Sequence, residues 1–351
     1  MNSQKFFVVS AFLTGFSICS YAATPPEQPL SGPGGQEYAY ASVTKHEYGE
    51  GASRYWIYEP ADPAPVSAPL VIFNHGWSAI NPKSYGAWIE HIVRRGNIVV
   101  YPIYQDSLRT PTPDFLPNAF SAVRDALVVL QQNGHVHPML DKIAVVGHSM
   151  GGIMSADMAA IAQAQGLPQP KAVMCVEPDG GNKYHLQDLS QIPAQTLFLI
   201  IVGDADRIAK DTTAKKIYQA STSLPVSNKN YIIVQSDSHG SPPLKANHLA
   251  PVAPDDQFDS GERLNRGQND DDNPGPIRER LRMFIKARLA SRQQTTPNAL
   301  NYYGYWKLFD ALCDAAFYGK NRDFALGNTP KQRYMGQWSD GVPVKELLVS
   351  S

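Results

Sequence analysis

A serine in the middle of the chain stands in a setting that suits a nucleophile. Ser149 is the centre of residues 147–151, which read Gly-His-Ser-Met-Gly and fit the pattern Gly-x-Ser-x-Gly. An apolar run at 142–146 precedes it, and small residues at 150–160 follow it. This order predicts a buried strand, a sharp turn and a helix, which together expose the serine hydroxyl at a sheet edge. The two glycines favour the turn, because strand and helix backbones would pass close together there.

A serine hydroxyl attacks a carbonyl efficiently only if a base removes its proton, and the base needs an acidic group to orient it. The acid is expected on the loop after the apolar run 196–202, where Asp204 and Asp206 compete. We favour Asp206, because it lies further out on the loop and Ile208 after it can pack beside the site. Asp204 would then be a turn or cap residue.

The base is expected on the loop after the last apolar run, 231–234. His239 is the first histidine there and is followed by a flexible glycine, so we predict it as the base. His248 and His185 are the alternatives, but His185 precedes the acid and breaks the chain order serine, acid, histidine. The other histidines are expected to be surface or packing residues: His46, His91, His135 and His137.

Negative charge on the attacked carbonyl oxygen would need two backbone N–H donors. We expect one from Met150, the residue after the serine. The other is expected from Trp77, on the loop after the apolar run 69–73, with Gly76 allowing the backbone to turn inward.

Five residues are expected to line the substrate pocket: His75, Gly76, Glu177, Asp179 and Ile208. Glu177 and Asp179 follow the apolar run 172–176 and should lie near the pocket mouth. Their charges would disfavour anionic acyl groups, most strongly at low salt.

Short apolar runs alternate with helical stretches along the chain. Strands are expected at 55–58, 69–73, 97–101, 142–146, 172–176, 196–202 and 231–234, and helices at 84–95, 117–132, 150–165 and 211–220. Continuous β-branched runs indicate strands buried on both faces, so we predict an α/β fold with a mostly parallel, doubly wound sheet. The short segment between Val176 and Thr196 leaves no room for a large cap, which predicts an open cleft.

The serine motif, Asn74-His75-Gly76-Trp77, segment 203–209 and Ser238-His239 together resemble the α/β-hydrolase superfamily. The resemblance covers roughly residues 50–290. Within the superfamily the chain is most similar to the branch of chlorophyllases, platelet-activating-factor acetylhydrolases and cutinase-like polyesterases. That branch implies a serine esterase. Two departures argue against aromatic polyesters: Glu177-Pro178 stands where polyesterases usually carry Pro-Trp, and Lys210 where a proline often follows the acid loop.

The chain ends differ in character from the middle. Lys5, an apolar stretch at 6–18 and Ser20-Tyr21-Ala22 are typical of a secretory signal with cleavage near Ala22. We therefore expect a periplasmic or secreted protein without a stable membrane anchor. Residues 23–36 are expected to be a flexible leader, 37–292 the catalytic domain, and 293–351 an extension packed on it.

Composition narrows the partners. The formal net charge is −1, which argues against a nucleic-acid partner. Neither a nucleotide fingerprint nor metal-type spacing of cysteine and histidine is apparent, so no metal or cofactor is expected. The acidic run 269–273 is interpreted as a solvated loop rather than a calcium site, and an amphipathic helix is expected at 277–292. Cys175 and Cys313 could pair, although a mid-strand Cys175 also suits a buried thiol.

These features predict an exported serine hydrolase that cleaves small-molecule or lipid-like esters through an acyl-enzyme. A peptidase or acyltransferase acting on amides or thioesters would use the same residues. A non-catalytic binding protein is the alternative from another class.

Overall fold

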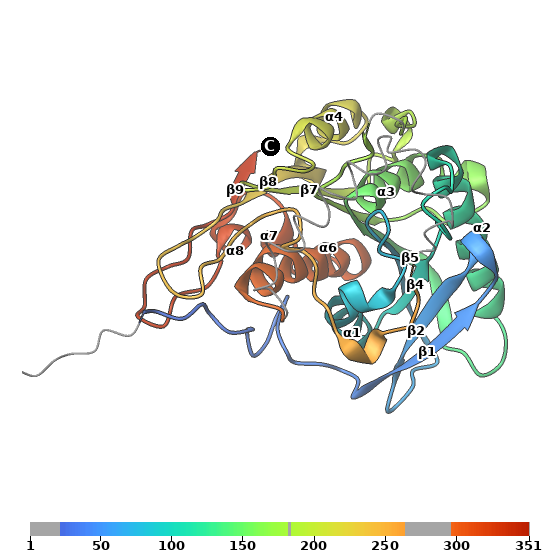
Figure 1. Cartoon of the computed structure of the whole chain (residues 1–351), viewed down its shortest axis with the longest axis horizontal. Helices are drawn as coiled ribbons and strands as arrows, with labels where there is room; N and C mark the ends of the chain where they lie inside the picture. The colour runs from blue at the N-terminus through green and yellow to red at the C-terminus, as the bar shows by residue number, and fades with distance from the viewer. Residues whose placement is uncertain (1–21, 182–183, 264–295, 351) are drawn as a thin grey trace, which may run out of the picture.

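The computed structural model describes residues 22–181, 184–263 and 296–350. A nine-stranded sheet crosses it in the order β1-β2-β4-β3-β5-β6-β7-β8-β9 (Figure 1). The strands are β1 Ser42–Tyr48, β2 Tyr55–Ala61, β3 Ser67–Asn74, β4 Ile98–Pro102, β5 His137–His148, β6 Ala172–Val176, β7 Leu197–Gly203, β8 Lys229–Val234 and β9 Leu348–Ser350. Strands β3 to β8 run parallel, whereas β1, β2 and β9 are antiparallel to their neighbours.

Helices cover both faces of the sheet. On one face lie α1 Gly86–Arg94 and α6 Lys307–Tyr318; on the other lie α2 Phe115–Val129, α3 Met150–Ile161 and α4 Thr212–Ala220 (Figure 1). Every residue of β6 and β7 is buried, as expected for strands covered on both faces. The predicted doubly wound, mostly parallel α/β fold is confirmed. No helix of the described segments is long and apolar enough to cross a bilayer.

Short helices complete the connections. They are η1 Gly51–Ser53, η2 Pro82–Tyr85, η3 Thr112–Asp114, η4 Gln163–Gln165, η6 Leu189–Gln191, η7 Val226–Asn228, η8 Asp256–Phe258, the π-helix η9 Leu300–Trp306, α7 Arg322–Ala325 and α8 Pro330–Arg333. All seven expected strands are present, as are the four expected helices that fall within the described residues, with ends shifted by a few residues. Strands β1 and β9 were not expected. They lie at the sheet edges, where half-buried or exposed residues give no continuous apolar run.

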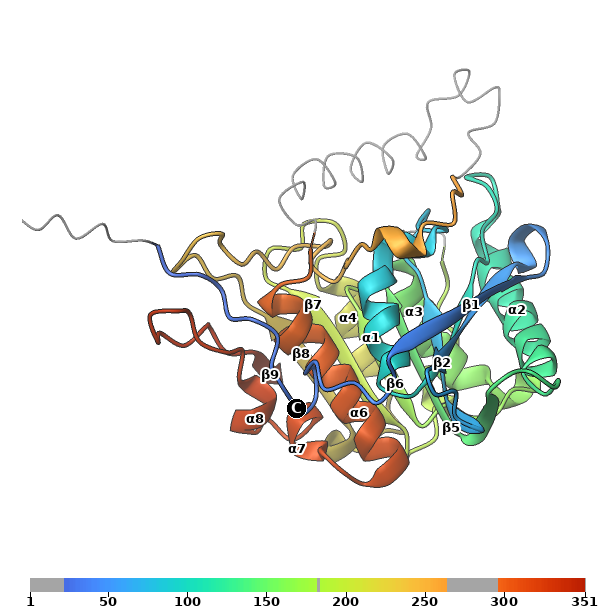
Figure 2. The ribbon, with the colours of Figure 1, turned by 90° about the horizontal axis from the view of Figure 1, so that it is seen from below.

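The C-terminal segment belongs to the same layers as the rest. Helix α6 lies along the sheet beside α1 (Figure 2) and contacts β5, β6 and β7. Trp88 of α1 packs edge-on against Phe309 of α6, and β9 extends the sheet beside β8. The expected division at residue 293 therefore does not coincide with a division of the fold.

The leader is packed, contrary to the expected flexibility. It contains no helix or strand among residues 22–36, but the Gly34 N–H donates to Asp310 Oδ2 of α6 at 2.7 Å, and Arg95 donates to the Gly32 carbonyl. Ala23 is 8% exposed.

Three expected features lie outside the described residues: the secretory signal before Ala22, the acidic run 269–273 and the helix at 277–292.

Cys175 and Cys313 are free, buried thiols. Cys175 packs with the residues of α2, α3 and α4, and Cys313 belongs to the cluster on the α6 side. The sheet separates the two side chains, so they form no disulfide.

Candidate active site

Ser149 lies on the sharp turn between β5 and α3. Its φ is +56° and its ψ is −119°, a strained conformation for a residue with a side chain. A Cβ on Gly147 would overlap the carbonyl of Gly151, and one on Gly151 would overlap the carbonyl of Asn74. The close approach of strand, helix and β3 loop therefore explains both glycines of the motif.

Three side chains form a hydrogen-bonded row at the carboxyl end of the sheet. His248 Nε2 lies 3.0 Å from Ser149 Oγ, and His248 Nδ1 lies 2.8 Å from Asp206 Oδ2. An ionised carboxylate can only accept, so Nδ1 must carry the proton and Nε2 presents a lone pair to the serine hydroxyl. The row is therefore arranged for proton transfer from Ser149 to His248.

The hydrogen bonds of Asp206 keep it ionised. Its Oδ1 accepts from the backbone N–H of Ile208 at 2.7 Å and of Ala209 at 3.0 Å. Burial alone would oppose the charge, but His248 foremost, followed by Glu177 and the Ile208 N–H, lowers the pKa of Asp206 to about 2. Asp204 instead is exposed and accepts from the Ser236 N–H at 2.9 Å, which makes it a turn residue.

His239 does not lie beside the serine, so its prediction as the base is wrong. It lies on the exposed surface, with Nε2 2.7 Å from Asp340 Oδ2 and its ring against Trp338. The loop after β8 closes an antiparallel bridge between Asp237 and Leu244. His239 lies in the loop that this bridge closes, residues 237–244, which points away from Ser149. The chain returns to the site after Leu244 and places His248 there.

The sequence held a signal for His248. Residues 249 and 250, Leu and Ala, are apolar and buried in the structure, whereas His239 is followed by Gly-Ser-Pro-Pro. An apolar stretch after a histidine indicates a loop that packs back onto the core, as this one does. His185, the other alternative, lies elsewhere, in a surface hollow described below.

Comparison with known proteins supports the fold that carries these residues. A family model described as alpha/beta hydrolase fold matches residues 71–222, from β3 to the end of α4. The chain has the α/β-hydrolase fold. No curated protein matches the chain. The matched segment contains Ser149 and Asp206 but ends before His248, so the histidine is assigned here from geometry.

A second row of hydrogen bonds lies beneath Ser149 and His248. The Gly76 N–H donates to the Tyr85 hydroxyl at 3.0 Å, the hydroxyl lies 2.8 Å from His148 Nδ1, and His148 Nε2 lies 2.8 Å from the His248 carbonyl. Burial lowers the pKa of His148 to about 3, so its ring is neutral. Since a carbonyl only accepts, Nε2 donates to it and Nδ1 accepts from Tyr85. The row joins the β3 loop, the serine turn and the backbone of His248, and sequence reasoning missed it.

The two amides expected to bind a carbonyl oxygen belong to residues next to the serine or next to a residue that approaches it. Met150 is in the first turn of α3, where helix N–H groups lack intrahelical partners. Trp77 follows Gly76, and a Cβ on Gly76 would lie 3.5 Å from Ser149 Cβ. Neither the Met150 nor the Trp77 amide donates a hydrogen bond to a residue of the described ranges.

The expected pocket residues divide into two groups. Asp179 and Ile208 are half-buried beside the site: the Asp179 N–H donates to the Ser149 carbonyl at 3.1 Å, and the Ile208 N–H donates to Asp206. Gly76 lies next to the serine. His75 and Glu177 are fully buried, so they do not line an open pocket.

The burial of His75 has a clear cause. Its ring stacks between Tyr104 and Tyr101, with ring centroids 4.1 and 5.3 Å apart, and both ring nitrogens face carbonyl oxygens. Burial lowers its pKa to about 4, so it packs as a neutral ring beneath the β3 loop.

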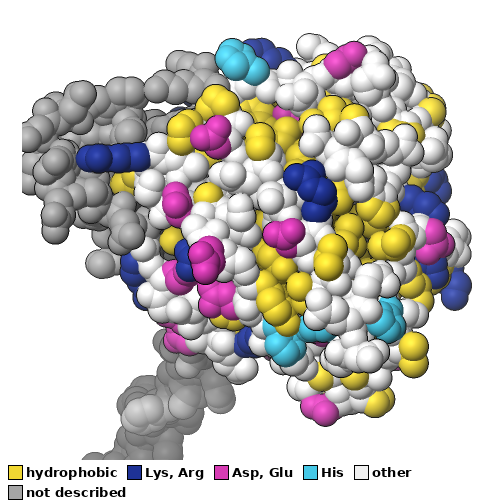
Figure 3. Space-filling view, turned by 90° about the vertical axis from the view of Figure 1, so that its right-hand side faces the viewer, with side chains coloured by type: hydrophobic (Ala, Val, Ile, Leu, Met, Phe, Trp, Pro, Cys, Tyr) yellow, Lys and Arg dark blue, Asp and Glu magenta, His cyan; other side chains and the backbone are white. Residues whose placement is uncertain are grey.

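A hollow of about 330 Å³ opens between α2, the end of α3 and the segment around Tyr184 and His185. Figure 3 shows the face that carries α2, where hydrophobic side chains are exposed in patches between polar ones. The residues that line the hollow are Thr112, Pro113, Leu116, Pro117, Phe120, Ile161, Gln165, Tyr184, His185 and Gln187. None of Ser149, His248 and Asp206 lines it.

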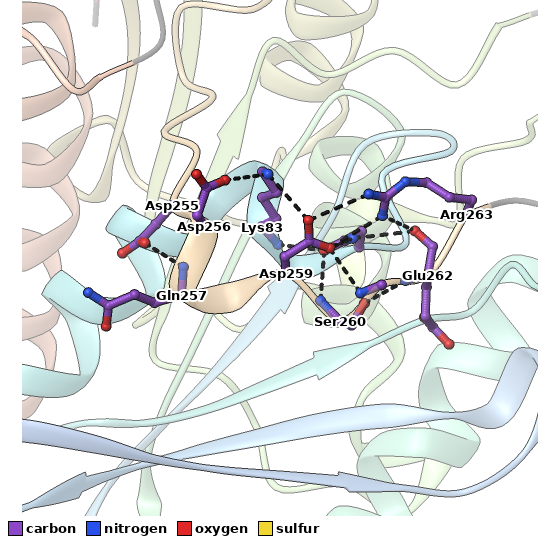
Figure 4. Close-up of polar contacts among 10 residues, drawn as sticks. Lys83, Asp255, Asp256, Gln257, Asp259, Ser260, Glu262 and Arg263 are labelled. Carbon is purple, nitrogen blue, oxygen red and sulfur yellow. Dashed lines mark hydrogen bonds and ion pairs between the residues drawn. The ribbon is translucent and has the colours of Figure 1, made fainter.

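A charged cluster fixes the chain beyond His248 (Figure 4). Asp259 Oδ1 accepts from Asn81 Nδ2 at 2.7 Å, and Asp259 Oδ2 lies 3.2 Å from Lys83 Nζ. Lys83 also pairs with Asp256. Hydrogen bonds, foremost from Asn81, hold the pKa of Asp259 below its usual range. The cluster ties the segment after His248 to η2, the short helix that ends at Tyr85.

Within the part of the chain that the structure describes, two groups of side chains have ligand atoms close enough to hold a metal ion: Glu177, Asp206 and His248, and His46, Glu59 and His135. In the first, both nitrogens of His248 are already engaged by Asp206 and Ser149. In the second, Glu59 accepts from His135 Nδ1 at 2.8 Å and from the Val136 N–H at 2.6 Å. These hydrogen bonds explain both groups, and we assign no metal ligand.

Proposed function

We propose that this protein is a serine hydrolase that cleaves carboxylic esters, with Ser149 as nucleophile, His248 as base and Asp206 as the acid that orients it. The observation that carries the proposal is the unbroken row of hydrogen bonds from Ser149 Oγ through His248 to Asp206. The hydrolase fold supports it, because members of the matched family are usually esterases or lipases.

The hydrogen-bond directions define the proton path. His248 Nε2 takes the proton of the Ser149 hydroxyl as Oγ attacks the acyl carbonyl, while Asp206 stabilises the imidazolium. The same proton then passes to the leaving alcohol, and the acyl group remains on Ser149. Water, deprotonated by His248, releases the acid and restores the serine.

The oxyanion would bind at the Met150 and Trp77 amides. Backbone donors that are already oriented need no reorganisation as charge develops. The row from Gly76 through Tyr85 and His148 supports this role, since it fixes the β3 loop relative to the serine turn.

Substrate class and location are proposed from the sequence and the connection between β6 and β7. That connection contains only η6 among its described helices, which supports an open cleft for short- to medium-chain esters. The expected signal sequence supports export to the periplasm or the medium. The resemblance to the chlorophyllase, platelet-activating-factor acetylhydrolase and polyesterase branch is compatible with such esters.

The test is a panel of p-nitrophenyl esters graded by acyl length, with the corresponding anilides and thioesters. We expect butyrate-type esters to be hydrolysed fastest, and Ser149→Ala to lose the activity while its thermal unfolding stays near wild type. Faster cleavage of the anilide would instead indicate a peptidase. No turnover with any member of the panel, or full turnover in Ser149→Ala, would contradict the proposal.

A further inference from the structure

A buried carboxyl group beside Asp206 has no part in the steps above. Glu177 follows β6 directly, with φ +46°, and its N–H donates to the Ile201 carbonyl of β7 at 2.8 Å. A positive φ is uncommon for a residue with a side chain and strained. The turn therefore holds Glu177 at the carboxyl end of the sheet, between β6 and β7.

The carboxyl group lies among the residues of the site and away from water. One of its carboxyl oxygens lies within 4.8 Å of a carboxylate oxygen of Asp206 and of a ring nitrogen of His248. A Cβ on Gly203 would come 3.0 Å from Glu177 Oε1, so the missing side chain of that glycine leaves room for the acid. Glu177 is 0% exposed, and neither oxygen accepts a well-formed hydrogen bond from a described donor.

The two neighbouring acids are unequally supported. Asp206 accepts hydrogen bonds from His248 and from two backbone N–H groups, and these stabilise its charge. Glu177 has only a weak contact with the Gly203 N–H, which does not offset its burial, and two adjacent buried carboxylates cannot both ionise without strong repulsion. Burial, followed by the charge of Asp206, raises the pKa of Glu177 well above its usual range. The proton of the pair therefore belongs to Glu177.

We propose that Glu177 is a neutral carboxylic acid during catalysis and that its O–H donates a hydrogen bond to the Asp206 carboxylate. It is a positioning residue, because it acts on the reaction only through Asp206. The hydrogen bond fixes the orientation of Asp206 and weakens its attraction for the proton on His248 Nδ1. This kinetic role rests on the proposed function, whereas the protonation of Glu177 does not.

Three other titratable groups face Glu177, and none of them can take its place as the proton donor to Asp206. They are Asp204 on the loop after β7, Tyr231 on β8 and Tyr305 ahead of α6. Burial raises the pKa of both tyrosines, to about 12 for Tyr231, so both stay neutral. Asp204 is exposed and hydrogen-bonded to Ser236.

Two substitutions with side chains of similar size to glutamate test whether Glu177 acts as a hydrogen-bond donor or as a negative charge. Glu177→Gln keeps an N–H donor, and Glu177→Met removes it. In the pH profile of kcat/KM, we expect Glu177→Gln to keep the acid limb at its wild-type position. In Glu177→Met, Asp206 loses the hydrogen bond from residue 177 and therefore holds the proton of the His248 imidazolium more strongly. We expect the acid limb to move to higher pH and kcat/KM to fall roughly tenfold. An acid limb that moves to lower pH in Glu177→Gln would overturn the proposal, since it would mean that a negative charge had been removed.

A measurement independent of turnover tests the proton itself. Burial also raises the pKa of Asp157, to about 7, so two buried acids contribute to the infrared carbonyl band of protonated carboxyl groups at pH 7. We expect the same band intensity in wild type and in Ser149→Ala, and the loss of the Glu177 component in Glu177→Gln, which the difference spectrum between wild type and Glu177→Gln isolates. Wild-type spectra unchanged by Glu177→Gln would overturn the proposal. If Ser149→Ala still hydrolyses esters, the proposed function fails while the band still reports on Glu177. Should Glu177→Met not fold, the band and the acid limb of Glu177→Gln decide.

Discussion

Two histidines that follow β8 each contact an aspartate, at similar distances but in different surroundings. His239 Nε2 lies 2.7 Å from Asp340, and His248 Nδ1 lies 2.8 Å from Asp206. The side chains of the first pair are 36% and 44% exposed, and those of the second 4% and 0%. A short histidine–acid contact therefore does not by itself identify a catalytic base.

The choice of ring nitrogen distinguishes the pairs. His248 gives Nδ1 to its acid and keeps Nε2 for Ser149, whereas His239 uses Nε2 on Asp340 at the surface. Water competes with an exposed histidine–carboxylate contact and leaves its geometry loosely held. A buried pair holds its geometry because no water competes with it. The four predictions that follow test this contrast.

Removing the two imidazoles should give the largest difference. We expect His248→Asn to lower kcat/KM by roughly 10⁴-fold or more, because no other group can take the serine proton. His239→Asn should stay within about twofold of wild type, as expected for an exposed surface pair. Steady-state ester hydrolysis of both purified variants provides the measurement, and equal losses would remove the distinction between the pairs.

Neutralising the acids should repeat the contrast at a smaller scale. Asp206→Asn can leave His248 in the wrong tautomer, an effect of roughly 10⁴ in kcat in a serine protease. Asp340→Asn and Asp204→Asn should lose no more than about threefold, since neither carboxylate contacts His248. If Asp204→Asn were the inactive variant, the acid would be misassigned.

The row beneath the site should contribute less than the catalytic residues. Tyr85→Phe removes the hydroxyl that lies between Gly76 and His148 and leaves the Gly76 N–H without its partner. A hydrogen bond of this kind stabilises by about 0.5–1.5 kcal/mol, so we expect kcat to fall roughly 2–10-fold with little change in KM. Tyr48→Phe, whose hydroxyl contacts His135 at the sheet edge, is the matched control. A loss in the control as large as in Tyr85→Phe would argue against a specific role.

Charge at the pocket mouth should have the smallest effect. Because Glu177 is buried, only Asp179 remains to repel anionic acyl groups. Asp179→Asn should raise the rate for succinate half-esters relative to butyrate esters about two- to threefold at low salt, and the gain should vanish at about 1 M salt. Asp211→Asn, on the loop before α4, should leave the ratio unchanged. An unchanged ratio in Asp179→Asn would place that carboxylate outside the pocket.

Local patterns in the sequence predicted the elements that depend on local contacts. Ser149 was found because strand, turn and helix are neighbours in the chain, and Asp206 because acids of this kind follow a strand. His248 depends instead on distant contacts. The loop that carries His239 is held by Trp338 and Lys345, both of which hydrogen-bond to Asp237. No spacing near residue 239 reveals them.

The position of Glu177 also follows from tertiary structure. Its place after a strand suggested the pocket mouth, but the side chain is fully buried beside Gly203 of β7, whose other neighbour is the Ala246 carbonyl. Edge strand β9 pairs with β8 across more than a hundred residues, which likewise leaves no local signature.

The most direct measurement is the time course of labelling by a fluorophosphonate probe, followed by mapping of the labelled peptide. We expect one adduct, on Ser149, formed at the same rate in wild type and His239→Asn and at a rate reduced by orders of magnitude in His248→Asn. Rapid labelling of His248→Asn together with slow labelling of His239→Asn would contradict the assignment of His248 as the base.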